Sequence, residues 1–236
     1  MGIRSYIRSW TEQQERQRAN IHFLHIGKTG GTEIKRWLKA INEMPAPTRF
    51  SLHGHSVTLA SIPKGDAYFF SIRDPLERFR SGFYSRKRKG RPRINAKWSE
   101  HEERAFANFQ HASELAEELF EPDRRGESAR RAMGAIGHVR KSQADWFFSQ
   151  GYFLEIRPPV YIIRQPFLDE DLTFLLRKLG LEVPKIPPAN SVVAHRNPYP
   201  EGSELSRKAK VNLRKWYARD IEFVKDCERW LLRQEP

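Results

Sequence analysis

The stretch that decides the fold is IHFLHIGKTGGTEIKRWLKAI, residues 21–41. Its apolar run at 21–26 predicts a short buried strand. The segment 27–31, GKTGG, is too rich in glycine for a regular element. Beyond it, with Thr32 near the start, apolar residues recur at helical spacing at Ile34, Trp37, Leu38 and Ile41. The sequence therefore predicts a strand, a glycine loop and a helix in succession.

The rest of the chain repeats this alternation. Further buried strands are predicted at AYFFSI, residues 67–72, and at VYIIR, residues 160–164. Predicted helices cover residues 4–18, 32–41, 75–85, 99–120, 127–149 and 167–180, and a C-terminal stretch that includes 213–231. Five prolines predict a loop over 181–202. Strands that alternate with helices favour an α/β fold with a mainly parallel sheet flanked by helices.

The length of 236 residues suits a single domain, residues 1–236, with residues 1–18 as an N-terminal helical extension. Cys227 is the single cysteine, so no internal disulfide forms and a reducing compartment is expected. No apolar run approaches the ~20 residues that span a bilayer, and the N-terminal stretch lacks the apolar core of a secretory signal. We expect a soluble, cytoplasmic protein without a transmembrane segment.

The formal net charge of +13 predicts an anionic partner or substrate. The positive charge is densest between Arg86 and Arg93, where six of eight residues are basic. Two interpretations stay open for this segment: a solvated basic loop, and a rim that binds a polyanion such as an anionic saccharide.

The glycine loop has the properties of an anion site. Backbone N–H groups at the start of a helix point outward, and the helix dipole adds positive potential. Glycine allows tight curvature at Gly27, Gly30 and Gly31. Lys28 adds a positive charge, and Thr29 and Thr32 add hydroxyl donors. The alternative is an ordinary strand-to-helix turn with a surface lysine.

The loop is not a Walker A motif, because the first glycine of that motif would fall at His22. No acidic residue offers a clear magnesium ligand, since Asp74 directly follows Arg73. A metal-free transfer of an anionic group therefore suits the loop better than ATP chemistry.

A second candidate anion-binding segment follows the strand at 67–72. Arg73 ends this strand and can hold a phosphate with its fork of donors. Ser81 lies eight residues further on, at a position where its hydroxyl can reach the same phosphate. In the alternative interpretation, Arg73 pairs with Asp74 and Ser81 is a small packing residue. Arg78 and Arg80 share the segment, and a structural role is open for Arg78.

Two histidines flank a glycine between these segments, in SLHGHS, residues 51–56. Histidine titrates near neutrality, at about pH 6.5, and can accept a proton there. His53 and His55 are therefore candidates for a general base, with a core or surface role as the alternative.

Two stretches carry a resemblance to a known family. HIGKTGGT, residues 25–32, resembles the 5′-phosphosulfate-binding loop of sulfotransferases that use 3′-phosphoadenosine 5′-phosphosulfate (PAPS). SIRDPLERFRSGFYS, residues 71–85, resembles the 3′-phosphate-binding segment of the same family. The similarity is greatest to the branch of heparan sulfate and uronyl 2-O-sulfotransferases and small bacterial relatives. Many members have proline where this chain has Gly27.

The resemblance implies a P-loop-like sulfotransferase fold and transfer of a sulfuryl group from PAPS to a carbohydrate or glycoconjugate hydroxyl. It implies that Gly27 to Thr32 bind the cofactor together with Arg73 and Ser81. The branch has a similar His-Gly-His segment, which implies His55 as general base and His53 as an assisting residue. Lys28 would then stabilise the leaving oxygen, and no metal is expected.

Weaker signals and other functions stay open. His138, Arg140, Gln143 and Trp146 suit an acceptor groove, or equally a helix cap and a buried aromatic. Arg196 lies in NSVVAHRNPYP, residues 190–200, and suits a lid over the nucleotide. A metal-dependent nucleotide or sugar kinase and a basic nucleic-acid-binding protein are the alternatives. The enzyme interpretation itself expects no nucleic-acid partner.

Overall fold

The computed structural model describes residues 19–148, 150–185 and 199–234. Four strands form one parallel sheet in the order β2-β1-β3-β4. The strands are β1 (Ala19–Leu24), β2 (Thr48–Leu52), β3 (Ala67–Ile72) and β4 (Ile162–Arg164). The α/β class with a parallel sheet flanked by helices is therefore confirmed.

The chain leaves β1 in one direction and β3 in the other, as in doubly wound sheets. The first crossover contains α2 (Gly31–Asn42). The crossover from β3 to β4 is long and contains most of the described α-helices. Its members are α3 (Pro75–Lys87), α4 (Glu100–Asn108), α5 (Ala112–Glu117), α6 (Arg124–Ala135), η2 (Gln143–Phe147) and α7 (Phe153–Ile156). The remaining elements are η1 (Leu59–Ser61), η3 (Gln165–Phe167), α8 (Leu168–Lys178), α9 (Arg207–Trp216) and α10 (Ala218–Leu232).

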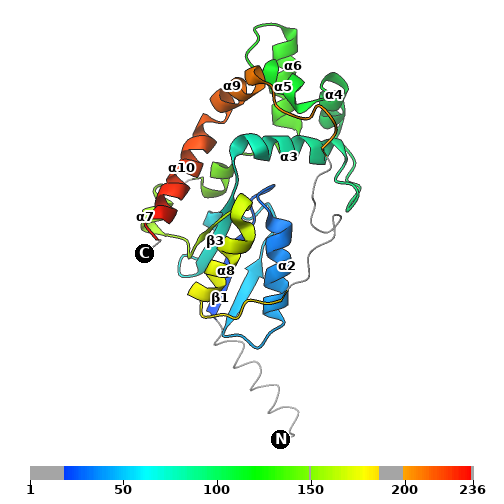
Figure 1. Cartoon of the computed structure of the whole chain (residues 1–236). Helices are drawn as coiled ribbons and strands as arrows, with labels where there is room; N and C mark the ends of the chain where they lie inside the picture. Colours follow the sequence, from blue (N-terminus) through cyan, green and yellow to red (C-terminus); the bar gives the residue numbers. More distant parts are fainter. Residues whose placement is uncertain (1–18, 149, 186–198, 235–236) are drawn as a thin grey trace, which may run out of the picture.

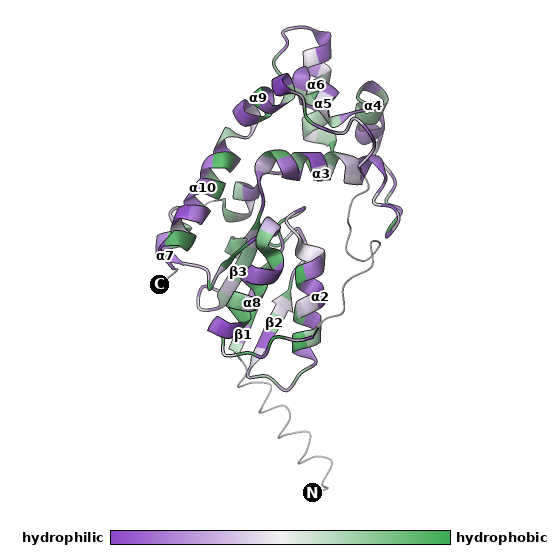
Figure 2. Ribbon diagram, in the orientation of Figure 1, coloured by the Kyte–Doolittle hydropathy of each residue, from purple (hydrophilic) through white to green (hydrophobic). Residues whose placement is uncertain are grey.

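Two hydrophobic clusters hold these elements. The first surrounds the sheet, where Phe69 contacts Phe23 and Phe50 and the neighbouring Phe70 contacts η2, α7 and α10 through aromatic rings. The second joins α3 to α4, α5, α6 and α9, which group together above the sheet in Figure 1. Figure 2 shows hydrophobic residues along the strands and mixed faces on the outer helices. Helix α3 lies between the two clusters, so most of its residues are buried.

Several predicted boundaries were wrong. The helix predicted over 99–120 is two helices, because Glu114 accepts from the backbone N–H groups of Gln110 and His111 and so starts α5 afresh. The helix predicted over 127–149 starts earlier, at Arg124, and ends at Ala135, where Ile136 adopts an extended backbone.

The C-terminal helical stretch breaks at Tyr217, between α9 and α10. Strand β2 was missed, because TRFSL offers few apolar residues and its pattern was read only from residue 51, as a turn. The basic segment is in part helical, since α3 extends to Lys87. The predicted extension at 1–18, and residues 186–198 of the loop predicted over 181–202, lie outside the described residues.

No helix in the described part of the chain is both long and apolar enough to cross a membrane.

Candidate functional site

The glycine loop runs from the end of β1 to the start of α2 and has left-handed backbone at two positions. Lys28 has φ 70° and Gly30, the N-cap residue, has φ 89°. No side chain caps α2, so the N–H groups of its first turn have no side-chain acceptor. Thr29 is fully buried, and its hydroxyl donates to the Ile26 carbonyl at 2.8 Å and lies 2.7 Å from Ser71 Oγ of β3. The loop is therefore attached to the neighbouring strand, and at the start of α2 the Glu33 and Ile34 N–H groups donate to the Gly30 carbonyl.

Gly31 is required by packing rather than by its backbone angles. A Cβ atom here would overlap the His25 ring, with three ring atoms within 3.0 Å. Gly27 is different, because a Cβ there would meet only His55 and His138 at 3.6–3.8 Å, which is ordinary contact. The loop thus has no room for a side chain at Gly31, whereas at Gly27 a methyl group would make only ordinary contacts.

Lys28 lies among positive charges. Burial lowers the pKa of Lys28 to about 8, and the nearby Arg73, Arg88 and Arg78 act in the same direction. Among the described residues, no carboxylate forms an ion pair with Lys28. A buried cation that lacks a counter-ion is stabilised by an anionic ligand.

Arg73 reaches the glycine loop from the end of β3. Its Nη1 donates to the Lys28 carbonyl at 3.4 Å, and its Nη2 lies 3.8 Å from Glu77 Oε2. Its Nε is buried and has no hydrogen-bond partner in the described part of the chain. Asp74, its expected ion-pair partner in the structural interpretation, instead caps α3 by accepting from the Glu77 N–H. Arg73 and the loop therefore face one region at the carboxyl ends of the strands.

Ser81 is placed less favourably for a ligand, because only 4% of it is exposed within α3. Thr32 accepts from Arg93 Nη1 at 3.2 Å, so the basic segment returns to the start of α2. Arg196 lies outside the described residues.

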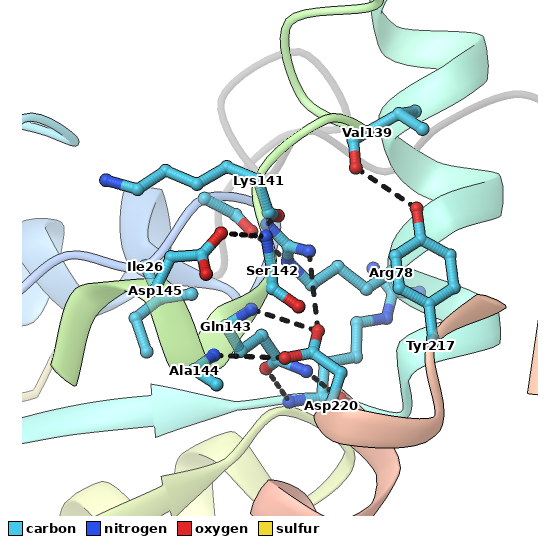
Figure 3. A network of polar contacts seen from close by, with 12 residues as sticks. Ile26, Arg78, Val139, Lys141, Ser142, Gln143, Ala144, Asp145, Tyr217 and Asp220 are labelled. Atoms are coloured by element: carbon cyan, nitrogen blue, oxygen red, sulfur yellow. Dashed lines mark hydrogen bonds and ion pairs between the residues drawn. The ribbon is translucent and has the colours of Figure 1, made fainter. Parts of the chain in front are cut away.

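A buried polar network supports both the loop and Arg73 (Figure 3). Arg78 donates from Nε to the Gly27 carbonyl and from Nη2 to the Lys141 carbonyl, both at 2.8 Å. The Gln143 side chain accepts from the Arg73 N–H and donates to the Arg73 carbonyl. Gln143 is fully buried, so it does not line an acceptor groove. Asp220, which has no local sequence pattern and was not predicted, contacts both residues: it accepts from the Gln143 N–H and lies 3.9 Å from Arg78 Nη1.

His55 lies beside the strand end of the loop. Its Nδ1 is 3.2 Å from the His25 carbonyl, and because a carbonyl only accepts, Nδ1 carries the proton. The lone pair of the neutral ring is then on Nε2. Partial burial lowers the pKa of His55. The hydrogen bond to the His25 carbonyl raises this pKa, whereas the positive charges of Lys35, Lys28 and Arg78 lower it further. His55 is therefore a neutral proton acceptor at pH values near 7.

His53 belongs to a different set of contacts. Its Nε2 is 2.7 Å from His22 Nδ1, and His22 Nε2 is 2.9 Å from Asp66 Oδ2. Burial lowers the pKa of His53, and His22 adds to this effect. This chain of contacts was not predicted, because no local sequence pattern links His22, His53 and Asp66.

His138 joins the His55 side of the site. Its ring centroid is 6.0 Å from that of His55, and burial together with the positive charge of Lys28 lowers its pKa to about 3. Arg140 is exposed, and Trp146 is buried beneath Lys141 and Arg78.

Two hollows adjoin these residues. A cavity of about 480 Å³ lies between the ends of β3 and β4 and helix α10, with Arg73, Arg164 and Phe167 in its wall. A second, of about 340 Å³, lies within the basic segment and is lined by Lys87, Arg88, Lys89 and Arg91. Arg86 instead forms an ion pair with the buried Glu102 at 2.6 Å.

The described residues contain no group of three or more histidine, cysteine or acidic side chains arranged to hold a metal ion. Comparisons with protein-family models, with curated proteins and with solved structures gave no match.

Proposed function

We propose that the protein is a PAPS-dependent sulfotransferase that transfers a sulfuryl group to a hydroxyl of a carbohydrate or glycoconjugate. One observation carries the proposal: the Arg73 guanidinium reaches the Lys28 carbonyl, so the two phosphate-binding segments adjoin one site. In open α/β sheets, ligands bind at this carboxyl edge of the strands. The P-loop-like sulfotransferase fold is part of the same proposal.

The residues present suit a doubly phosphorylated nucleotide. The N–H groups of residues 27–32 and the Thr32 hydroxyl bind the 5′-phosphosulfate, which gives Lys28 the counter-charge it lacks. The Thr29 hydroxyl does not take part, because it is buried and bonded to Ile26 and Ser71. Arg73 binds the 3′-phosphate through donors such as its unpartnered Nε. The cavity of about 480 Å³ beside Arg73 is within the usual size of small-ligand sites and accommodates the adenosine. Ser81 contributes a hydrogen bond only if α3 exposes it further.

His55 is assigned as the general base. Its Nε2 accepts the proton of the acceptor hydroxyl while the acceptor oxygen bonds to sulfur. The nucleotide supplies the sulfuryl group, and the bond from sulfur to the bridging phosphate oxygen breaks with its electron pair on that oxygen. Lys28 and the loop N–H groups stabilise the developing charge. A positioned base contributes on the order of 10²–10⁴ in rate.

The basic segment suits an anionic acceptor. Lys87, Arg88, Lys89 and Arg91 line a hollow on it, and Arg93 connects it to Thr32 at the start of α2. An acidic saccharide bound along this segment would reach the glycine loop. His53 then assists by positioning the acceptor, held by His22 and Asp66.

A kinase is less well supported. The carboxylates closest to the two arginines, Glu77 and Asp220, already serve Arg73 and Arg78, and Asp74 caps α3. None of the three is left to hold magnesium at the loop. A nucleic-acid-binding protein would use the basic segment but has no need for the buried cationic site around Lys28.

The test is a thermal-shift and calorimetric comparison of adenosine 3′,5′-bisphosphate with ATP and magnesium. We expect selective stabilisation by the bisphosphate, and we expect Arg73→Ala to weaken its binding by at least about tenfold. Arg140→Ala, which removes an exposed arginine, is the matched control and should bind normally. Equal or stronger stabilisation by ATP and magnesium would reject the sulfotransferase in favour of the kinase.

A further inference from the structure

Asp220 lies in the first turn of α10 and is fully buried. Its Oδ2 accepts from the Gln143 N–H at 2.9 Å, and its Oδ1 accepts from the Ala144 N–H at 3.0 Å. Its Oδ2 also lies 3.9 Å from Arg78 Nη1. A single carboxylate therefore fixes the start of η2 and neutralises a buried arginine (Figure 3).

Two of these three contacts, those to Gln143 and Arg78, continue to the phosphate-binding segments. Through Gln143, the network holds the backbone of Arg73. The Gln143 side-chain amide accepts from the Arg73 N–H at 3.0 Å and donates to the Arg73 carbonyl at 2.9 Å. Through Arg78, the network holds the glycine loop, because Nε donates to the Gly27 carbonyl. Gln143 thus continues the backbone pairing of β3 by one residue beyond the end of the strand.

The network supports the two segments beyond the point where the hydrogen bonds between the strands end. The ladder between β1 and β3 ends with Leu24 paired to Phe70, so neither Gly27 nor Arg73 belongs to it. Two other contacts join the loop to β3 and the residue after it: the hydroxyls of Thr29 and Ser71 lie 2.7 Å apart, and Arg73 Nη1 donates to the Lys28 carbonyl at 3.4 Å. The network adds the two bonds that hold the Arg73 backbone and the bond that holds the Gly27 carbonyl, so the relative position of the two anion-binding segments depends on it as well.

We propose that Asp220, Gln143 and Arg78 are positioning residues that fix the separation between the two phosphate sites and so select a nucleotide phosphorylated at both the 3′ and 5′ positions. The inference rests on the proposed function. None of the three touches the reacting atoms in this role. Their effect is on the gain in affinity that a ligand obtains from carrying two phosphates instead of one.

The experiment measures this gain directly. Calorimetry gives Kd for adenosine 5′-monophosphate and for adenosine 3′,5′-bisphosphate, and the ratio of the two values reports how well both sites are used together. A purely structural defect lowers the folded fraction for both ligands equally and leaves the ratio unchanged. We expect a ratio of at least about 30 in the native protein, since a charge-assisted phosphate contact is a strong one.

Gln143→Met is the main variant, because it removes both bonds to Arg73 and keeps Asp220 paired with Arg78. We expect it to reduce the ratio by about tenfold, within the usual range of coupling between sites. Asp220→Asn should reduce the ratio as well, although it leaves a buried arginine without its counter-charge. If Asp220→Asn does not fold, Gln143→Met alone still tests the positioning role.

The matched control is Asn212→Leu in α9. Asn212 is buried, and its side chain also makes two hydrogen bonds to backbone carbonyls, those of Ala116 and Glu117 at 3.0 Å. We expect a lower Tm and an unchanged ratio. An unchanged ratio in Gln143→Met would overturn the positioning role alone. A ratio near 1 in the native protein would instead overturn the bisphosphate site and the proposed function with it.

Discussion

The protonation of Lys28 gives the most specific prediction about the site. Its ammonium is buried among Arg73, Arg78 and Arg88, and burial is the main reason that its pKa falls from 10.5 to about 8. A bound phosphate favours the charged form and should return this pKa to about 10.5. Binding of adenosine 3′,5′-bisphosphate therefore requires the protonated lysine and takes up a proton wherever the free lysine has lost it.

The sign and size follow from these two pKa values. Affinity is full below pH 8 and is lost as pH rises through 8, because an increasing fraction of the free protein must first bind a proton. If the pKa of Lys28 is about 8 in the free protein and about 10.5 in the complex, Kd is about 70-fold larger at pH 10 than at pH 7. The same shift predicts proton uptake of about 0.1 per ligand at pH 7 and about 0.9 at pH 9. The phosphates lose their second proton near pH 6, so the ligand charge is nearly constant above about pH 8, and the uptake at pH 9 reports the lysine.

Calorimetry in pairs of buffers with different ionisation enthalpies measures both quantities. Lys28→Met should bind more weakly at about pH 7 and lose the proton uptake at about pH 9. Lys35 is the matched control, because its pKa is also lowered, by burial and by Lys39 and Arg93, and Lys35→Met should keep the uptake. Proton uptake that survives in Lys28→Met would refute the reasoning, as would a Kd that is constant between pH 7 and pH 10.

Two further predictions concern the base and the loop. His55→Ala should keep bisphosphate binding and lose transfer from radiolabelled PAPS to a desulfated heparan-type polysaccharide by about 10²–10⁴, whereas His53→Ala should lose far less; the opposite pattern would make His53 the base. Gly31→Ala should destabilise the fold by about 1–3 kcal/mol through overlap with His25, while Gly27→Ala should leave Tm nearly unchanged. Thermal unfolding checks the second prediction, and equal Tm values for the two alanine variants would contradict it.

Local patterns predicted the elements that carry the site. The apolar run at 21–26 and the glycines after it identified β1 and the loop, because both depend on neighbouring residues. The end of β3 at Ile72, followed by Arg73, was predicted to the residue. Strand β2 was not predicted, because its alternation of buried and exposed residues is short, within five residues, and it forms an edge of the sheet.

Contacts between residues that are distant along the chain could not be predicted from the sequence. Gln143 and Arg73 are separated by 70 positions, and Asp220 and Gln143 by 77. A buried glutamine that pairs with a backbone has no local pattern, so Gln143 was interpreted as a groove or cap residue. Gly31 was attributed to backbone freedom, whereas the need for glycine comes from the His25 ring. Tertiary packing, and not turn chemistry, selects the residue there.

The distribution of acidic residues around the site explains why an anion should stabilise the protein as well as bind to it. Arg73 and Arg78 each have a carboxylate nearby, Glu77 at 3.8 Å and Asp220 at 3.9 Å. Those carboxylates reduce the cost of burying the two arginines but leave the charge of Lys28 without compensation.

The free protein therefore carries the free-energy cost of a buried cation, and a bound phosphate lowers that cost. A ligand that binds only the folded state adds RT ln(1 + [L]/Kd) to the free energy of unfolding. At a concentration 100 times Kd this is about 2.7 kcal/mol, which in a chain of this size raises Tm by about 5–11 °C. A bisphosphate that binds at the basic segment instead leaves Lys28 uncompensated, so Lys28→Met distinguishes the two locations: it removes the proton uptake only if the phosphate contacts the loop.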